Sequence, residues 1–243
     1  MYKKYFEGKK SAFFDLDGTI IDSLPYWERA CRLVLEDISN DVSSIYGVER
    51  GTFLGDMWKK TIENYGLKTD LSIEELVKRT HHEYLELYKE GPLEPRDGFW
   101  ALVDELKNGK HWSLALVSNS DRSVVYPIIK DLNIHEGVFD LVITGDEVKH
   151  HKPAPDIYQK VLKSLKLKNH EVVVFEDSVS GSEAANGAGL EVIAIWNGEV
   201  PEPEYPKNVV MFLPDFSSIS GNMDTTFMEK AQKDLKSLQS EFS

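Results

Sequence analysis

The chain lacks several features that mark secreted, membrane-bound or disulfide-stabilised proteins. Its 243 residues contain one cysteine, Cys31, which excludes an intramolecular disulfide and suits a reducing compartment. No apolar run approaches the roughly 20 residues that span a bilayer. The charged start at residues 1–4 is not followed by the apolar core of a signal peptide. We therefore expect a cytoplasmic protein without a membrane anchor.

Positive charge is also scarce. The chain has 28 Lys and Arg against 41 Asp and Glu, a formal net charge of −13, which argues against nucleic acid or an anionic membrane as the main partner. Its 41% hydrophobic and 28% charged residues are typical of globular proteins. The length allows one sizeable core and a smaller accessory domain. We expect a monomer.

The segment 12–19 is the most informative one that is present. Its apolar start predicts a buried strand, and it ends in Asp15, Asp17, Gly18 and Thr19. Two residues of spacing in an extended chain place Asp15 and Asp17 on the same side. Such a close pair of carboxylates needs a cation or a shared proton. Taken alone, the segment is equally compatible with an Asp-Gly turn after a strand.

A long helical stretch follows that first strand. Ser23 is a good N-cap before Pro25, and Ser72 with Glu75 forms a capping-box pattern before a third helix. The helices have no strand between them, and a simple crossover needs far fewer residues. We predict an inserted α-helical cap domain over residues 24–92 and a core made of residues 1–23 and 93–243.

Beyond Gly98 the pattern alternates between helices and strands, which predicts an α/β fold with a doubly wound parallel sheet. The predicted strands are 112–118, 139–144, 171–175 and 190–195. The predicted helices are 99–108, 122–132 and 155–165, with one more between the last two strands and another at about 224–241.

Polar residues follow these strands where each one ends. Ser118 and Asn119 end one apolar run, and Glu176 and Asp177 end another. Lys152 lies in a Lys-Pro-x-Pro segment between a strand and a helix. Ligands of open α/β sheets bind at the carboxyl ends of the strands, so these residues are expected to share one site.

These four segments, in this order, resemble the motifs of the haloacid dehalogenase-like superfamily of phosphohydrolases, in its β-phosphoglucomutase and phosphoglycolate phosphatase-like branch. The resemblance covers nearly the whole chain and implies a Rossmann-like core. It implies that Gly18, Thr19, Ser118, Asn119 and Lys152 bind the phosphoryl group. Thr19 either orients Asp17 or caps a turn.

The resemblance also implies the chemistry of a magnesium-dependent phosphatase acting on a small phosphorylated metabolite. Asp15 can attack phosphorus to form an aspartyl-phosphate, and Asp17 can protonate the leaving alkoxide and then activate water. Mg²⁺ would be held by Asp15, Asp177 and the backbone carbonyl of Asp17. Glu176 is either a direct ligand or hydrogen-bonded to a coordinated water. Lys152 balances the charge of the nucleophile.

Three alternatives remain open: a phosphomutase of the β-phosphoglucomutase type, a phosphorylatable receiver-like signalling domain, and a silent binding protein with this fold. The mutase is less favoured because Trp27 stands where such enzymes carry a histidine. Trp27 and Trp58 are each predicted to pack inside the cap, since aromatics at helical spacing are usually core. Four histidines are predicted to be surface or loop residues: His81, His82, His150 and His151.

Overall fold

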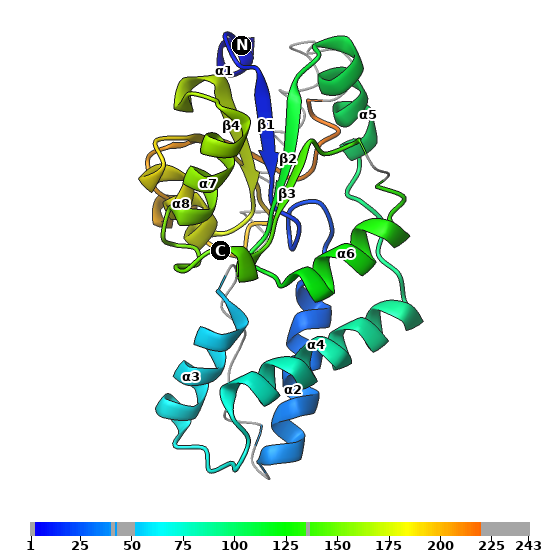
Figure 1. Cartoon of the computed structure of the whole chain (residues 1–243), viewed down its shortest axis with the longest axis vertical. Helices are drawn as coiled ribbons and strands as arrows, with labels where there is room; N and C mark the ends of the chain where they lie inside the picture. The colour runs from blue at the N-terminus through cyan, green and yellow to red at the C-terminus, as the bar shows by residue number, and fades with distance from the viewer. Residues whose placement is uncertain (1–2, 40–41, 43–51, 135–136, 220–243) are drawn as a thin grey trace.

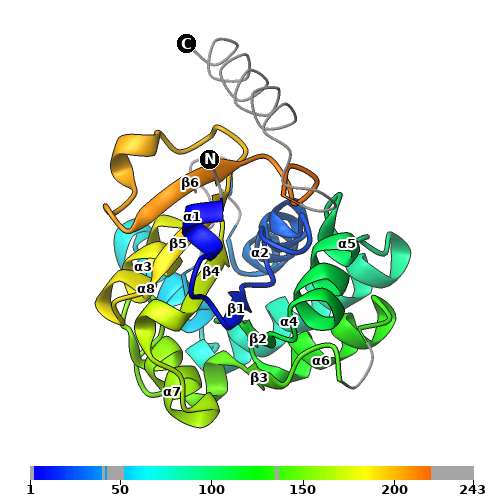
Figure 2. The same cartoon turned by 90° about the horizontal axis from the view of Figure 1, so that it is seen from above.

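The computed structural model describes residues 3–39, 42, 52–134 and 137–219. The predicted C-terminal helix at about 224–241 lies outside the described residues. The described part contains one six-stranded sheet, helices on both of its faces, and three further helices at one end (Figures 1 and 2).

The sheet is wholly parallel, and its strand order is β3-β2-β1-β4-β5-β6. This confirms the predicted doubly wound α/β class. The strands are β1 (Ser11–Phe14), β2 (Ser113–Val117), β3 (Leu141–Ile143), β4 (Val172–Glu176), β5 (Glu191–Ile195) and β6 (Val209–Leu213). The last strand was not predicted, because a proline-rich connection without an α-helix joins it to β5 and the βα alternation stops there.

Each central strand is apolar on both sides because both faces of the sheet are covered. In β1, Phe14 packs in the core on one face, beside Phe99 and Phe175, and Phe13 packs in the core on the other face, beside Tyr158. The covering helices are α5 (Phe99–Asp104, continued by a π-helical turn Glu105–Gly109), α6 (Arg122–Asp131), α7 (Asp156–Leu165) and α8 (Val179–Gly187). A short α1 (Lys3–Phe6) precedes the sheet.

The order of the strands determines where a ligand can bind. From β1 the sheet grows through β2 and β3 in one direction and through β4, β5 and β6 in the other. The crevice between β1 and β4 is therefore the point at which the winding reverses, and in sheets of this kind ligands bind at such a point, at the carboxyl ends of the strands.

Three helices lie beyond those carboxyl ends (Figure 1). They are α2 (Leu24–Ile38), α3 (Leu54–Tyr65) and α4 (Ile73–Glu90). They share a hydrophobic cluster of their own: Cys31, Val34, Leu35, Met57, Trp58 and Leu76. The predicted capping box is confirmed, because Ser72 Oγ accepts from the Glu75 N–H and the Glu75 carboxylate accepts from the Ser72 N–H.

The prediction for Trp58 is also confirmed. Its side chain is fully buried in this cluster, and its Nε1 donates to Thr80 Oγ1 at 3.0 Å.

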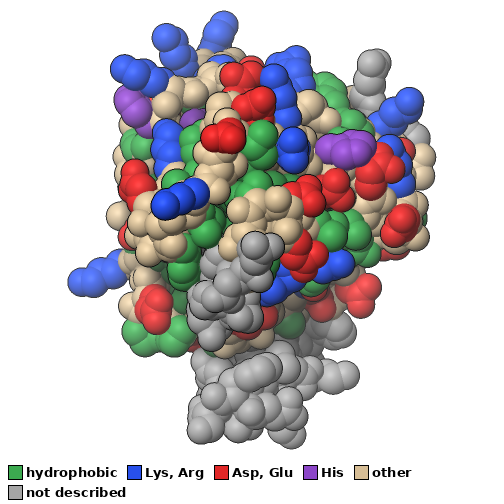
Figure 3. Space-filling view, turned by 90° about the horizontal axis from the view of Figure 1, so that it is seen from below, with side chains coloured by type: hydrophobic (Ala, Val, Ile, Leu, Met, Phe, Trp, Pro, Cys, Tyr) green, Lys and Arg blue, Asp and Glu red, His purple; other side chains and the backbone are tan. Residues whose placement is uncertain are grey.

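When the molecule is seen from below relative to Figure 1, acidic and basic side chains lie side by side on its surface (Figure 3). Within the described residues, no helix combines the length and the apolar character needed to cross a membrane.

Candidate active site

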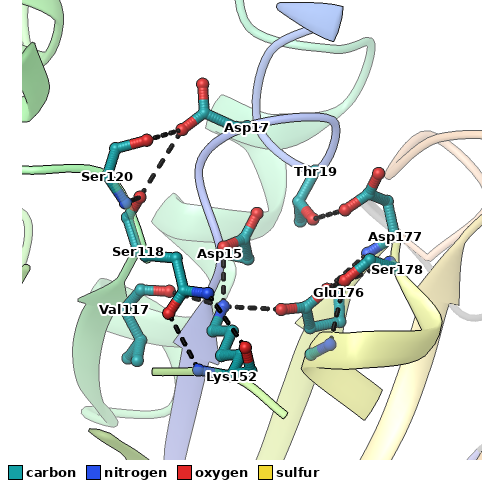
Figure 4. A network of polar contacts seen from close by, with 12 residues as sticks. Asp15, Asp17, Thr19, Val117, Ser118, Ser120, Lys152, Glu176, Asp177 and Ser178 are labelled. Atoms are coloured by element: carbon teal, nitrogen blue, oxygen red, sulfur yellow. Dashed lines mark hydrogen bonds and ion pairs between the residues drawn. The ribbon is translucent and has the colours of Figure 1, made fainter. Parts of the chain in front are cut away.

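Lys152 is the centre of a buried charge network between β1 and β4 (Figure 4). Its Nζ donates to Asp15 Oδ1 at 2.7 Å, to Glu176 Oε1 at 2.6 Å and to the carbonyl oxygen of Val117 at 3.0 Å. The three side chains are at most 9% exposed. An ammonium group has three N–H bonds, so Lys152 is fully engaged here and can bind a phosphoryl oxygen only by exchanging one of these acceptors.

Burial dominates the titration of this network. It raises the pKa of Asp15 to about 7, against the attraction of Lys152. The charges of Glu176 and Asp17 add to the rise. Burial alone would lower the pKa of Lys152, but Asp15 and Glu176 outweigh it and hold that pKa well above its usual value. Lys152 therefore stays charged at neutral pH, whereas Asp15 takes up a proton readily.

Glu176 is held by donors on both carboxylate oxygens. Oε2 accepts from the N–H groups of Asp177 (3.0 Å) and Ser178 (3.1 Å) and from Ser178 Oγ (3.0 Å). Oε1 accepts from Tyr158 at 3.3 Å as well as from Lys152. Gly181 of α8 allows this, because a Cβ at that position would overlap the Glu176 carboxylate.

Asp177 completes the acidic group from the end of β4. Tyr205 donates to its backbone carbonyl at 2.6 Å, and Thr19 Oγ1 lies 3.5 Å from its Oδ1. Thr19 was predicted to orient Asp17 or to cap a turn; its hydroxyl lies against Asp177 instead. Gly18 has a φ of +87° and must lack a side chain, since a Cβ would overlap the Asp177 carboxylate.

The donor set fits a hard divalent cation. Asp15, Glu176 and Asp177 are buried, and each offers one oxygen atom within 4.8 Å of the others. Lys152 brings one positive charge against these three carboxylates. Mg²⁺ prefers carboxylate oxygens together with water and phosphate oxygens. A divalent cation at this position would neutralise the excess negative charge that burial makes costly.

Asp17 has a separate set of partners. Its Oδ1 accepts from Ser23 Oγ at 2.7 Å and from Trp27 Nε1 at 2.8 Å. Its Oδ2 accepts from Ser120 Oγ at 2.7 Å and lies 3.5 Å from Ser118 Oγ. Ser23 does stand before α2, but its side chain makes no capping bond and turns to Asp17 instead.

Ser120 is a site residue that the sequence analysis missed. It follows Ser118 and Asn119 in the same loop, and its spacing of two residues from Ser118 was the available signal. The Asn119 side chain is engaged by the main chain of Lys152, with Oδ1 accepting from the Lys152 N–H at 3.1 Å. In this geometry Asn119 holds the loop that carries Lys152.

A small cavity of about 60 Å³ adjoins these groups. Its lining comes from the sheet edge, including Asp15, Asp17, Ser118, Asn119, Ser120, Asp121 and Lys152, and from the helical region, including Leu24, Trp27, Thr52, Phe53, Leu54 and His81. The site therefore lies between the sheet and the three helices.

This cavity bears on two predictions. Trp27 was predicted to pack, and it is 7% exposed and does pack; the contact of its N–H with Asp17 was not predicted. The prediction that His81 is a surface or loop residue is wrong, because its side chain is 12% exposed and lies 3.7 Å from Asp121. Burial lowers the pKa of His81 to about 4, against the charge of Asp17, so the ring is neutral at pH 7. His82 and His150 are exposed, as predicted.

Comparison with known proteins identifies the family. The family model described as haloacid dehalogenase-like hydrolase matches residues 12–195. The chain belongs to this family, in its phosphoglucomutase and phosphatase-like branch.

Individual relatives agree with this assignment. The chain is 33% identical over 193 residues to the phosphorylated carbohydrates phosphatase of Thermotoga maritima, covering 76% of this chain and 83% of that one. It is 28% identical over 199 residues to the fructose-1-phosphate phosphatase YqaB of Escherichia coli, covering 80% and 98%. A mutant of CbbY from Rhodobacter sphaeroides, solved with xylulose-(1,5)-bisphosphate, has the same fold, with a TM-score of 0.74, 23% identity and coverage of 86% and 95%.

Proposed function

We propose that this protein is a Mg²⁺-dependent phosphatase that hydrolyses a small phosphate monoester through an aspartyl-phosphate on Asp15. The observation that carries the proposal is the convergence of Asp15, Asp17, Lys152, Glu176 and Asp177, from distant parts of the sequence, on the crevice between β1 and β4. Family membership supports the same reaction class.

Each side chain of the site has its own role in the proposed reaction. Asp15, ionised, attacks phosphorus as the ester oxygen leaves, and Asp17 gives that oxygen a proton. Asp17, now ionised, takes a proton from the water that attacks phosphorus in the second step, and the bond between Asp15 and phosphorus breaks. Lys152 keeps Asp15 in place and favours its charged form. Inorganic phosphate is released, and both carboxyl groups return to their starting states.

Magnesium would be held by Asp15, Asp177 and the backbone carbonyl of Asp17, where it would supply positive charge to the phosphoryl oxygens. Glu176 is already satisfied by protein donors on both oxygens, which favours a role in orienting Lys152 and the neighbouring loop. Ser118 and Lys152 are proposed to contact the phosphoryl group.

We propose a sugar phosphate or a similar small metabolite as the substrate. Two relatives are named as phosphatases of phosphorylated carbohydrates. The small cavity beside Asp15 suits a compact leaving group, and the helices α2, α3 and α4 are proposed to form the cap that covers it.

The test is phosphate release from a panel of sugar phosphates with Mg²⁺, comparing the native protein with Asp15→Asn and Asp37→Asn. Asp37 is exposed on α2, so its variant controls for the loss of one carboxylate. Asp15→Asn should lower kcat by at least about 1,000-fold, as loss of a nucleophile does, while Asp37→Asn stays within about twofold. Continued turnover in Asp15→Asn would refute the assignment of the nucleophile.

The same assay separates the alternatives. A phosphomutase would convert one sugar phosphate into its isomer with little free phosphate. A receiver-like domain would become phosphorylated once and release phosphate slowly. Steady release of phosphate over many turnovers supports the phosphatase.

A further inference from the structure

Asp17 is anchored from two parts of the molecule. The serines that follow β2 bind one carboxylate oxygen, with Ser120 Oγ 2.7 Å from Oδ2 (Figure 4). Helix α2 and the residue before it bind the other oxygen, with Ser23 Oγ at 2.7 Å and Trp27 Nε1 at 2.8 Å from Oδ1. The two oxygens of this carboxylate therefore have chemically different partners.

Trp27 is fixed in position. Its ring stacks on Tyr84 of α4, with centroids 3.9 Å apart and planes inclined by 15°. His81 of the same helix packs against it at 6.0 Å in a T-shaped arrangement. The indole is 7% exposed. Because the ring is held by α4, the direction of its N–H bond toward Asp17 is set by packing between two helices.

An indole N–H can only donate, whereas the hydroxyl groups of Ser23 and Ser120 can donate or accept. Among these three partners of Asp17, Trp27 is thus the one whose hydrogen bond cannot be reversed. The carbonyl oxygen of a carboxylic acid is a better acceptor than its hydroxyl oxygen, so the Trp27 N–H favours Oδ1 as the carbonyl oxygen. The acidic proton of Asp17 is then favoured on Oδ2, the oxygen on the side of Ser118 and Ser120.

We infer that Trp27 is a positioning residue for the general acid, which directs the transferable proton of Asp17 to Oδ2. This inference rests on the proposed phosphatase function. In the first step the Oδ2–H bond breaks and the proton goes to the leaving oxygen, which keeps the electron pair of its former bond to phosphorus. In the second step Oδ2 takes a proton from water, and the Ser120 hydroxyl rotates to accept from it.

This role predicts a particular kinetic signature. A poor leaving group, such as the alkoxide of a sugar or glycerol phosphate, needs a proton as it departs. A good one, such as p-nitrophenolate, departs with little help. Loss of the indole N–H should therefore slow alkyl phosphates selectively, because general acid catalysis typically contributes about 100-fold to 10,000-fold.

The experiment compares Trp27→Phe with the native enzyme and with Trp58→Phe. Trp58 undergoes the same chemical change in the same helical region, but its N–H donates to Thr80 inside the hydrophobic cluster. We expect kcat for alkyl phosphates to fall by about 10-fold or more in Trp27→Phe, with less than about threefold change for p-nitrophenyl phosphate. Trp58→Phe should leave the ratio of the two substrates unchanged. Equal losses on both substrates in Trp27→Phe would overturn the inference.

A second substitution removes only the N–H. Benzothienylalanine at position 27 replaces the indole nitrogen by sulfur and keeps the shape that stacks on Tyr84. It should reproduce the selective loss even if Trp27→Phe folds poorly; unchanged leaving-group dependence would overturn the inference. If the native enzyme releases phosphate from these esters and only the variants fail to show the signature, the proposed function stands. If the native enzyme releases none, the proposed function itself is wrong.

Discussion

Replacing Lys152 by Met tests whether this lysine neutralises buried carboxylates. The substitution keeps the volume of the stem but leaves Asp15 and Glu176 without their cation. Removing one partner of a buried ion pair typically costs about 3–5 kcal/mol. The loss of folding free energy can be estimated more closely, because a buried carboxylate can become neutral by binding a proton.

The two carboxylates differ in this respect. Since the pKa of Asp15 is already about 7, protonating it at pH 7 adds only about 0.4 kcal/mol. In the unfolded chain a glutamate has a pKa of about 4.3, so folding with this side chain protonated costs about 3.7 kcal/mol at pH 7 and about 1.6 kcal/mol at pH 5.5. The lost hydrogen bond from Lys152 to the Val117 carbonyl adds about 1 kcal/mol at either pH. Lys152→Met should therefore cost roughly 5 kcal/mol at pH 7 and roughly 3 kcal/mol at pH 5.5.

Lys9→Met is the matched control. Lys9 Nζ also donates to a strand carbonyl, that of Val172 at 2.8 Å, and to a carboxylate, that of Glu191 at 2.7 Å. The Glu191 side chain is 48% exposed, so water can hydrate it once the lysine is gone. Urea unfolding in EDTA at the two pH values gives both costs. The reasoning fails if Lys152→Met costs no more than Lys9→Met at pH 7, or if its excess cost does not shrink at pH 5.5.

Three further predictions follow from the buried groups. The apparent affinity for Mg²⁺ should rise about tenfold from pH 6 to pH 8, because Asp15 is protonated below its pKa of about 7 and must lose the proton to bind a cation; calorimetry would show this, and a flat profile would contradict it. Gly181→Ala should lower stability by about 1–3 kcal/mol, because its Cβ displaces Glu176, whereas Gly109→Ala, with its nearest neighbour at 3.8 Å, should change it by less than about 0.5 kcal/mol; thermal unfolding of both variants measures the difference. Burial, helped by the charge of Glu28, raises the pKa of the Cys31 thiol from 9.0 to about 12, so its thiolate fraction at pH 8 is roughly 1,000-fold below that of the unfolded chain. Disulfide reagents should accordingly label the native protein at less than a hundredth of the unfolded rate, and faster labelling would show that the region opens.

The sheet was predictable because its apolar runs are followed directly by the polar residues of the predicted site. The strands β1, β2 and β4 are short, mainly apolar runs that end immediately before Asp15, Ser118 and Asp177. Parallel pairing then brings those ends to one edge. The motifs in the sequence therefore predict that the proposed nucleophile, the lysine and the acidic pair lie at that edge.

The surroundings of the site were less predictable, because they depend on how separate elements pack. Helical spacing indicated that Trp27 is buried, which is right, but spacing cannot say which polar atom its N–H meets. Tyr205 lies in a proline-rich stretch outside every predicted helix and strand, yet it is buried and donates to the Asp177 carbonyl. His81 is one of two adjacent histidines on α4, and only the orientation of that helix over the sheet distinguishes them.

In the proposed reaction, the nucleophile and the general acid are therefore supported by different parts of the molecule. Within the described residues, Asp15 and Lys152 take these partners from the sheet and its loops, so the core positions the proposed nucleophile. Asp17 takes one partner from the loop after β2 and another, Trp27, from helix α2. A movement of the helices away from the sheet would leave the nucleophile intact and release the indole N–H from the acid. In the proposed reaction, protonation of the leaving group would then require the helices to lie against the sheet, where the cavity is about 60 Å³.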